Sequence, residues 1–568
     1  MNPTRPYSFR RYTWLVVLTG LILLNWAGSI WHFSIDLTED KRFSLSTPTK
    51  HLLKELDSPV SVIVFLKGDF PAVFRNLRNT TGDLLREMQD YSGGRLEFSF
   101  IKPGEGLPDS LQARVYDSLQ AMGLKPYTLT VTAKPGEESS ERFVFPAAIV
   151  QYGGRMMPVD LLSAGGADND DVVNNAESLL EFKFADAIDR LTRKSVPKVA
   201  YLLGNGEPLN IHSYDAIKTL NAYYTLDTVT LWRIPYIPEQ YSAVVITKPV
   251  DAFTDDDKLK IDQYVMYGGK VLWFIDNLWA ELDSLQHTNQ FVAYDRGLNL
   301  EDQLFKYGVR INQDLIQDIQ QFDQVPQVVG SEGGKPQVQM VPWYYFPLLS
   351  PSDNSPISRN LEPVLSIFAN SIDTVKAPGI TKTILLTTSD HSRRLGTPAI
   401  VSWESIKTAP DPREYTQKQI PAAVLLEGQF HSLYANRLPA ATRDTLQQLG
   451  HPFLAEAKAP TKMIVVSDGD LILNAFTQQD GPLPMGTNQY TGDTHANKDF
   501  LLNSMEYLTS DDGIIETRNK QLVIRNLDKQ RVDDERLQWQ LINIALPVLL
   551  VVLVGLIYQQ IRKRKYQK

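Results

Sequence analysis

The C-terminal stretch Leu541–Tyr558 (LINIALPVLLVVLVGLIY) constrains this chain most, because it carries no formal charge. About 18 to 20 apolar residues, each rising about 1.5 Å in a helix, cross a hydrocarbon core of about 30 Å. A helix also satisfies its backbone hydrogen bonds internally, and Pro547 is tolerated in such a span. Basic side chains follow it directly: Arg562, Lys563, Arg564, Lys565 and Lys568. Since Lys and Arg beside a span resist translocation, the sequence predicts a membrane anchor with a cytoplasmic C-terminus.

A second uncharged run, Trp14–Phe33, lies near the other end and follows three arginines, Arg5, Arg10 and Arg11. A cleaved signal peptide has the same polarity and is the alternative. The length of the run, with Trp26 and Trp31 where a cleavage site would need small residues, favours a retained span. Both termini are then expected in the cytoplasm, and residues 34–540 outside it, in a bacterial periplasm.

The charge and the cysteine count limit the possible functions. The formal charge of the chain is −9, residues 1–13 carry +3 and residues 559–568 carry +5, so residues 14–558 carry −17. An acidic body argues against nucleic-acid binding. The absence of cysteine excludes disulfides, thiolate metal sites and a cysteine nucleophile. About 500 external residues suffice for two or three domains.

The first part of the body predicts a β-α-β-α-β-β order. The expected strands are Val60–Leu66, Arg95–Ile101, Tyr127–Ala133 and Arg142–Gln151, and the expected helices are Ala72–Tyr91 and Ser110–Met122. A turn at Gly153-Gly154 then leads into Met156–Leu161. This order resembles a thioredoxin-like layer in topology only, because without Cys-x-x-Cys it has no redox chemistry. Next, the acidic loop Ala164–Asp171 is interpreted as a linker rather than a calcium loop, since it lacks regular ligand spacing. An amphipathic helix is expected over Asn174–Arg193.

From Lys198 onward, strands and helices alternate with tight glycine turns, which predicts a mostly parallel sheet covered on both faces. The triplet Asp255–Asp257 follows Thr254, and carboxylates complement a helix N-terminus, so it is interpreted as a cap rather than a metal site. The stretch YGGKVLWFIDN is similar to the central strand of glutamine-amidotransferase-like domains. There a sharp turn presents a cysteine nucleophile, whereas here Asp276, Asn277 and Leu278 follow the strand, so the resemblance implies a retained fold without acyl-transfer chemistry.

Several stretches occur in a characteristic order: GVRINQDLIQD, PWYYFPLLSP, NLEPVLSIFANSIDTV, ILLTTSDHSR and VVSDGDLILN. With the two spans, they resemble the gliding-motility ABC-transporter accessory proteins of Bacteroidetes (the Gld-G group) and the broader auxiliary-subunit family of ABC systems. The resemblance implies an inner-membrane partner of a multi-span ABC permease and a cytoplasmic ABC ATPase, needed for gliding and associated secretion. The lipid bilayer and other periplasmic motility or secretion components are the remaining expected partners.

The residues agree with a non-catalytic role. The nearest approach to a P-loop, Gly330–Pro336 (GSEGGKP), ends in proline where a magnesium-binding hydroxyl is required. The histidines form no metal-binding spacing, so no metal and no cofactor are expected. Ser389-Asp390-His391 suggests a hydrolase, but local adjacency of these residues is usually a turn. Asp468-Gly469-Asp470 is compatible with a cation site or with a turn closed by its carboxylates.

Six polar residues directly follow predicted strands, where ligands bind in doubly wound sheets. They are Asn205, Glu207, Lys248, Asp276, Ser389 and Asp468. They form a hypothetical ligand crevice, with ordinary loop chemistry as the alternative. In the predicted loop Gln320–Pro356, an aromatic run is either an interface anchor or packs on the sheet edge. It consists of Trp343, Tyr344, Tyr345 and Phe346. Ile514–Arg525 is expected to form a short hairpin and Lys529–Gln540 a helix leading into the last span.

The sequence thus predicts an α/β protein with a thioredoxin-like domain and an amidotransferase-like mostly parallel sheet domain, flanked by two transmembrane helices. The expected divisions are 1–34 (first span), 35–163 (thioredoxin-like), 164–197 (linker and helix), 198–513 (amidotransferase-like), 514–540 (stalk) and 541–568 (last span and basic tail). The expected function is that of an ABC-transporter accessory subunit. A membrane-tethered solute- or peptide-binding protein and a degenerate hydrolase are the alternatives.

Overall fold

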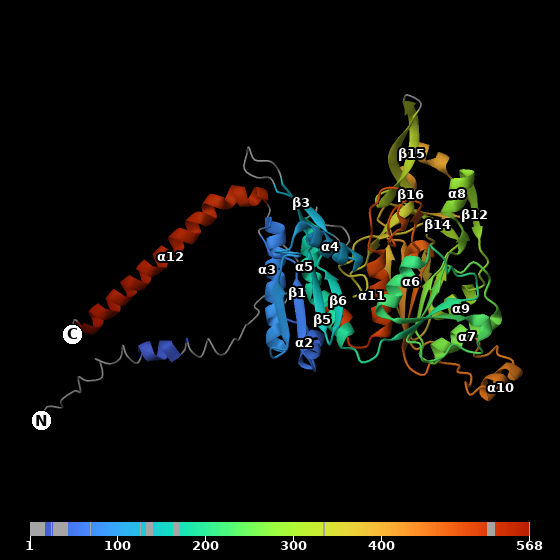
Figure 1. Ribbon diagram of the computed structural model, residues 1–568, viewed down its shortest axis with the longest axis horizontal. Helices are drawn as coiled ribbons and strands as arrows, with labels where there is room; N and C mark the ends of the chain where they lie inside the picture. Colours follow the sequence, from blue (N-terminus) through green and yellow to red (C-terminus); the bar gives the residue numbers. More distant parts are fainter. Residues whose placement is uncertain are drawn as a thin grey trace. The chain divides into compact units, whose positions relative to one another are not determined.

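The chain divides into two compact units, Met1–Gln521 and Leu522–Lys568, which are described separately. The computed structural model describes residues 17–23, 25, 44–68, 70–124, 126–131, 140–162, 170–332, 335–519 and 529–566. The first unit contains two main sheets with helices against them (Figure 1).

The first sheet has four strands in the order β2-β1-β5-β6. Its strands are β1 (Val60–Val64), β2 (Leu96–Phe100), β5 (Ala147–Tyr152) and β6 (Arg155–Asp160). β1 pairs with β2 in parallel and with β5 in antiparallel orientation, and β5 pairs with β6 in antiparallel orientation. The expected single strand Arg142–Gln151 is wrong. Pro146 interrupts it, since proline cannot donate to a sheet ladder, and β4 (Ser140–Val144) pairs instead with β3 (Tyr127–Val131).

Helices cover both faces of this sheet. The inward side chains of β1 pack with α2 (Thr47–Lys54), α3 (Ala72–Tyr91) and α5 (Asp170–Thr192) in one apolar cluster. α4 (Asp109–Ala121) packs on the other face through Leu119. The predicted acidic linker lies largely outside the described residues, and the helix that follows it begins at Asp170.

The second sheet has ten strands, and the path β15-β16-β19-β22-β23-β10-β9-β7-β8 includes all but β17, which pairs with β16. The bounds are β7 (Lys198–Leu203), β8 (Thr225–Thr230), β9 (Ala243–Thr247), β10 (Val271–Phe274), β15 (Phe322–Glu332), β16 (Lys335–Pro351), β17 (Val364–Leu365), β19 (Ile380–Thr387), β22 (Pro421–Gly428) and β23 (Thr461–Val466). β9 and β10 are buried along their whole length, as expected of parallel strands covered on both faces.

Two helices lie on each face of this sheet. α6 (Tyr214–Tyr223) and α11 (Asn497–Thr509) share one apolar cluster with the strands. α7 (Asp255–Met266) and α9 (Glu301–Tyr307) share the other. The predicted cap of α7 is confirmed, because Thr254 and Asp257 form a reciprocal capping box. α10 (Ala440–Gln448) packs its Leu446 with Leu259 of α7.

The prediction of a mostly parallel sheet is only half right. β8, β7, β9, β10 and β23 run parallel to one another, but β22, β19, β16 and β15 continue the sheet in antiparallel pairs. The physical reason lies in the connections: between β13 (Val309–Ile311) and β22, the structure has strands and short 3-10 turns but no α-helix. Antiparallel neighbours need no helical crossover, whereas parallel neighbours do.

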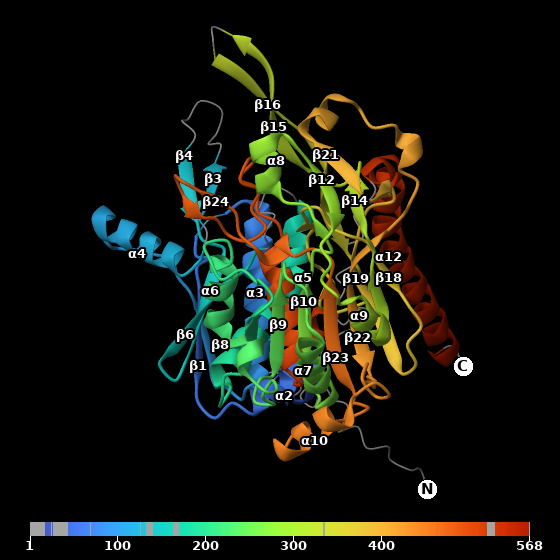
Figure 2. The ribbon, with the colours of Figure 1, turned by 90° about the vertical axis from the view of Figure 1, so that its right-hand side faces the viewer.

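The prediction of a loop over Gln320–Pro356 is also wrong, because most of this stretch forms the long hairpin of β15 and β16. The hairpin projects from the body in both views (Figures 1 and 2). Alternation of apolar and polar residues outweighs the high proline content there, and Val328 pairs with Val338 across the two strands.

Four smaller sheets lie outside the two main sheets in this part of the described chain. They join β11 (Leu278–Trp279) to β12 (Gln290–Asp295) and β21 (Ala399–Ser402), β13 to β18 (Ile372–Thr374), β14 (Asp314–Asp318) to β20 (Ser392–Gly396), and β24 (Phe476–Thr477) to β25 (Gly481–Pro482). The short helix α8 (Leu282–Thr288) precedes β12.

The second unit contains α12 (Lys529–Tyr566), so the predicted helix Lys529–Gln540 does continue into the segment predicted as the last span. Within the described residues, one helical segment, Gln538–Arg564, is long and apolar enough to cross a membrane. Most of the first predicted span lies outside the described residues. The predicted hairpin Ile514–Arg525 is wrong where it is described, since Ile514–Asn519 forms the 3-10 helix η6.

Candidate functional site

The carboxyl edge of the parallel strands is where a doubly wound sheet binds ligands, at the point where strand order reverses. That reversal occurs at β7, which lies between β8 and β9. Asn205 and Glu207 follow β7, Lys248 follows β9, Asp276 follows β10 and Asp468 follows β23. Five of the six predicted residues therefore lie along one stretch of this edge.

Lys248 lies at the centre of a buried ionic cluster. Its Nζ is 2.6 Å from Oδ1 of Asp470, 2.8 Å from Oε2 of Glu281 and 3.4 Å from Oδ2 of Asp276. Burial disfavours its ammonium, but these three carboxylates outweigh burial and raise the pKa of Lys248 above its ordinary value. The lysine therefore stays charged. The Asp468-Gly469-Asp470 sequence forms the turn that was the alternative to a cation site, because the backbone N of Asp470 donates to Oδ1 of Asp468 at 2.8 Å.

Asp468 and Gly469 make this close packing possible. Oδ2 of Asp468 accepts hydrogen bonds from Oγ of Ser366 (2.5 Å) and the backbone N of Ile367 (2.8 Å). Burial raises the pKa of Asp468 well above its usual range, and Asp276 and Asp470 raise it further. A Cβ at Gly469 would lie 2.7 Å from Cγ of Lys248, so no larger residue fits beside the lysine.

Glu281 and Arg296 complete the cluster, although no sequence pattern identified them. Nη2 of Arg296 lies 2.6 Å from Oε1 of Glu281, and the guanidinium stacks over Trp279 at 4.2 Å from the ring centroid. Burial alone would raise the pKa of Glu281, but Lys248 and Arg296 outweigh it and lower that pKa. Glu281 lies between β11 and α8, and Arg296 directly follows β12, so only the paths of these short elements after β10 bring both residues into the cluster.

The crevice between β7 and β9 is filled by the chain itself. The backbone O of Asn205 accepts hydrogen bonds at 2.9 Å from the N atoms of Val250 and Asp251. A Cβ at Gly206, whose φ is +82°, would lie 2.2 Å from Cγ2 of Val250. Glu207 turns back to accept a hydrogen bond from the backbone N of Asn205 at 2.8 Å, and burial raises its pKa to about 7. The loop after β9 thus occupies the place where a ligand would bind.

Ser389, the sixth predicted residue, is held elsewhere on the edge. Its Oγ donates to Oδ1 of Asp318 and its backbone N donates to Oδ2 of the same residue, both at 2.7 Å. The His391 ring bonds Gln320, and the backbone N of His391 donates to Ser389. The Ser-Asp-His sequence therefore forms a turn, and the ring of His391 is bonded away from the Ser389 hydroxyl that it would have to activate.

The aromatic run on β16 packs internally rather than presenting an open surface. Trp343, Tyr345 and Phe346 are buried in one apolar cluster, and Tyr344 is partly buried. Trp343 and Trp403 lie with their ring centroids 4.9 Å apart. The aromatic run therefore packs against the sheet, which is the second of the two expectations for it.

A group of carboxylates with a geometry suited to a metal lies where α5 meets α11. Oxygens of Asp189, Glu506 and Asp512 approach within 4.8 Å of one another. The guanidinium of Arg193 lies among them, 2.6 Å from Asp189 and 3.3 Å from Asp512, and it also pairs with Glu506. An arginine already neutralises these carboxylates, so the arrangement is an ion-pair network that joins α5 to α11.

The fold and site define an α/β protein whose ligand crevice is closed by its own side chains. The chain belongs to the family described as ABC-type uncharacterized transport system, an auxiliary component of ABC transport, whose model matches residues 196–504. Membership implies an accessory role with permease and ATPase partners in general. Residues 39–151 match a domain of unknown function, DUF7088.

Other comparisons add little about function. No curated protein matches the chain. One similar solved structure is the mmIFT52 N-terminal domain, with 13% identity, coverage of 56% of this chain and 98% of that one, and a TM-score of 0.30. Another is a putative ThuA-like protein from Parabacteroides merdae, with 11% identity, coverage of 56% of this chain and 91% of that one, and a TM-score of 0.26. An exo-beta-1,4-mannosidase from Opitutaceae bacterium strain TAV5 is also similar, with 10% identity, coverage of 70% of this chain and 45% of that one, and a TM-score of 0.18. At these TM-scores, the likenesses carry no argument about this chain.

Proposed function

We propose that this protein is a non-catalytic inner-membrane accessory subunit of an ABC transporter that serves gliding motility and associated secretion. Membership of the auxiliary family, through residues 196–504, is the observation that carries the proposal. The closed crevice supports a role without chemistry, because a substrate would have to displace Lys248 and the loop after β9. The gliding assignment rests on the ordered stretches that resemble the Gld-G group.

The proposed topology places both termini in the cytoplasm and the body in the periplasm. The apolar segment of α12 followed by basic residues supports this orientation, because basic residues beside a span resist translocation. The proposed body has a thioredoxin-like domain over 35–163, joined through residues 164–197 to an amidotransferase-like domain over 198–513. A stalk over 514–540 leads to the last span.

Purification of the tagged full-length protein from its own membranes in mild detergent tests the proposal. A multi-span permease and an ABC ATPase are expected among the co-purifying proteins identified by mass spectrometry. Loss of surface spreading on deletion of the gene is expected as well. Recovery of the protein without either transporter component, under conditions that preserve other ABC complexes, would contradict the accessory role.

Ligand binding in the predicted crevice is the alternative function, and its residues stay a prediction. It requires saturable binding of a small solute that is lost in Glu207→Ala or Lys248→Ala. Degenerate hydrolase activity requires an activity abolished by Ser389→Ala.

A further inference from the structure

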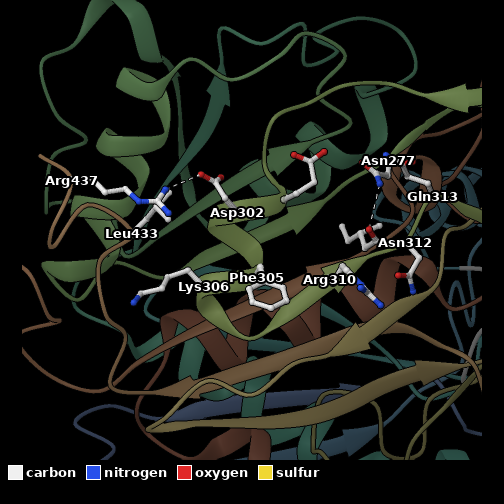
Figure 3. Close-up of a pocket in the computed structure, with 11 residues that line it drawn as sticks. Asn277, Asp302, Phe305, Lys306, Arg310, Asn312, Gln313, Leu433 and Arg437 are labelled. Carbon is white, nitrogen blue, oxygen red and sulfur yellow. Dashed lines mark hydrogen bonds and ion pairs between the residues drawn. The ribbon is translucent and has the colours of Figure 1, made fainter.

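An open groove lies beside the closed crevice (Figure 3). It has a volume of about 670 Å³, within the range of about 300–1,000 Å³ that is usual for small-ligand pockets. α9 and the start of β13 form one wall, and the loop carrying Leu433 and Arg437 forms the other. Asn277, directly after β10, lies at one end of the groove.

A single buried carboxylate holds both walls in place. Asp262 on α7 is fully buried. It accepts a hydrogen bond at 2.9 Å from the hydroxyl of Tyr307, the last residue of α9. It also accepts from Oγ of Ser432 at 2.6 Å and from the backbone N of Leu433 at 3.0 Å, both in the opposite wall. The groove is therefore preformed, which lowers the entropic cost of binding a ligand.

The charges in the groove are separated along one helix. Glu301, Asp302, Phe305 and Lys306 lie at i, i+1, i+4 and i+5 of α9, a spacing that places them on one face. Asp302 is paired with Lys258 at 2.8 Å and with Arg437 at 3.7 Å. Within the part of the chain that the structure describes, Glu301 and Lys306 have no ion-pair partner. One acid and one base thus remain available at opposite ends of the helix.

An exposed aromatic ring lies between these charges. The Phe305 side chain is 53% exposed, and in Figure 3 it lies between Lys306 and Arg310. Arg310 points outward from β13 and is paired with Asp373 at 2.7 Å, a pair exposed enough to be weak. Figure 3 shows the ring separating Lys306 from Arg310, so the Lys306 ammonium, which has no ion-pair partner among the described residues, is the cation available to a carboxylate on one side of the ring.

We propose that this groove binds a short zwitterionic peptide, with its ammonium at Glu301, its carboxylate at Lys306, and an apolar side chain on Phe305. Along the helix axis, Glu301 and Lys306 are about 7.5 Å apart at about 1.5 Å per residue. This separation is on the scale of an extended dipeptide, which spans about 7 Å. Asn312 and Gln313 line the same groove, and their amide nitrogens donate to Ser371 at 2.9 Å and Asp295 at 2.6 Å. This site does not depend on the transporter assignment.

Isothermal titration of the detergent-purified full-length protein with alanyl-phenylalanine tests the proposal. Saturable binding is expected, and N-acetyl-alanyl-phenylalanine and alanyl-phenylalanine amide are each expected to bind about five- to tenfold more weakly, as the loss of one charged contact implies. No saturable heat at millimolar peptide, or equal binding by either blocked peptide and the free one, would overturn the proposal.

Charge-removing variants assign each end of the peptide. Lys306→Gln should weaken the free dipeptide but leave the amide unchanged, whereas Glu301→Gln should weaken the free dipeptide but leave the N-acetyl form unchanged. Phe305→Ala should weaken all three. These side chains are exposed, so the three substitutions should not change the melting temperature. Lys407→Gln, at an exposed ion pair outside the groove, is the control and should bind all three peptides as the natural protein does. Binding unaffected by all three groove variants would refute this site.

Discussion

Lys248 illustrates how a charged residue is stabilised in the interior of this protein. It is 8% exposed and has a φ of +43°, an uncommon backbone conformation for a residue with a side chain. Its ammonium and the guanidinium of Arg296 face the carboxylates of Asp276, Glu281 and Asp470. A buried ionic group of this kind is stable as a set, and loss of one member leaves an uncompensated buried charge.

Replacement of Lys248 by methionine should therefore destabilise the protein by about 3–5 kcal/mol at pH 8. The loss should be smaller at pH 5, because burial raises the pKa of Asp470 to about 7 and its protonation removes one of the unpaired charges. Thermal unfolding of the detergent-purified natural protein and of the variant at both pH values measures the two losses of stability. Lys407→Met, at an exposed pair with Glu404, should have little effect.

Glu207 should make stability depend on pH in the opposite sense to an ion-paired carboxylate, whose pKa is lowered on folding. Because burial raises its pKa to about 7, the folded state binds the proton more tightly than the unfolded state. Its contribution is complete below pH 4.5 or so and is lost as the pH rises through about 7. Glu207→Gln should flatten the fall in melting temperature between pH 5 and pH 8. Glu97→Gln changes an exposed residue of β2. If it flattened the fall in melting temperature equally, the effect would come from the change in net charge and not from the burial of Glu207.

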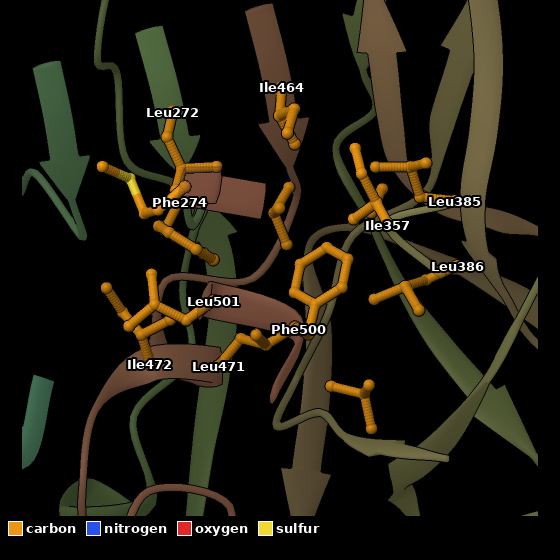
Figure 4. Packing of buried hydrophobic residues seen from close by; sticks show 14 of the residues in the cluster. Leu272, Phe274, Ile357, Leu385, Leu386, Ile464, Leu471, Ile472, Phe500 and Leu501 are labelled. Carbon is orange, nitrogen blue, oxygen red and sulfur yellow. The ribbon is translucent and has the colours of Figure 1, made fainter. Parts of the chain in front are cut away.

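At the scale of elements, α11 connects the two sheets. Phe500 and Leu501 pack beneath the second sheet with Ile464 and Leu386 (Figure 4). One turn later, Glu506 is 1% exposed and pairs with Arg190 at 2.9 Å and with Arg193, both on α5. The helix therefore packs by apolar contact on one sheet and binds by charge to the helix that covers the other.

Phe500→Ala should destabilise the protein by about 3–5 kcal/mol, because it opens a cavity between α11 and the sheet. Phe500→Leu should cost much less, since it keeps most of the volume. Thermal unfolding distinguishes the two. If Phe500→Ala melted like Phe305→Ala, which removes an exposed ring, the core position of Phe500 would be contradicted.

Glu506→Gln should loosen α5 without unfolding the parallel strands. Two arginines would lose their shared carboxylate, and a buried charge left without its partner is costly. Hydrogen exchange followed by mass spectrometry should show faster exchange in α5 and unchanged protection in β10. Asp83→Asn, at an exposed pair with Arg86, is the matched control and should leave both elements unchanged.

At the scale of the whole molecule, the proposed function depends on membrane topology. The natural chain contains no cysteine, so single engineered cysteines report their location without background. The proposal places the ectodomain and the residues after the last span on opposite sides of the membrane. The uncharged run of α12 and the basic residues that follow it support this placement.

Labelling with a membrane-impermeant maleimide, after the outer membrane is made permeable, tests the topology. Ser118→Cys, exposed on α4, should react in intact spheroplasts, whereas Gln560→Cys, which follows the uncharged run Leu541–Tyr558, should react only after lysis. Equal reactivity of both positions before lysis would contradict the placement of the C-terminus in the cytoplasm. The cysteine-free natural protein serves as the blank.

Parts of the site could be predicted from the sequence. Asn205, Glu207, Lys248, Asp276 and Asp468 follow parallel strands, and parallel strands end at one edge. Glu281 and Arg296 could not be predicted in this way. Glu281 pairs with Lys248 and Arg296 pairs with Glu281 only because the chain after β11 and β12 brings them there. The groove along α9 also had no sequence signal, since its opposite wall comes from more than 120 residues later in the chain.

The sequence by itself determined the elements whose patterns are local: the uncharged span in α12, the periodic helices and the buried strands of the parallel block. Backbone hydrogen bonding and apolar periodicity act over a few residues, so these features can be read along the chain. Only the tertiary structure decided that the antiparallel strands extend the sheet and that Lys248 fills the crevice. Strand pairing and buried charge depend on partners that are distant in the chain, and their free energy exists only once those partners meet.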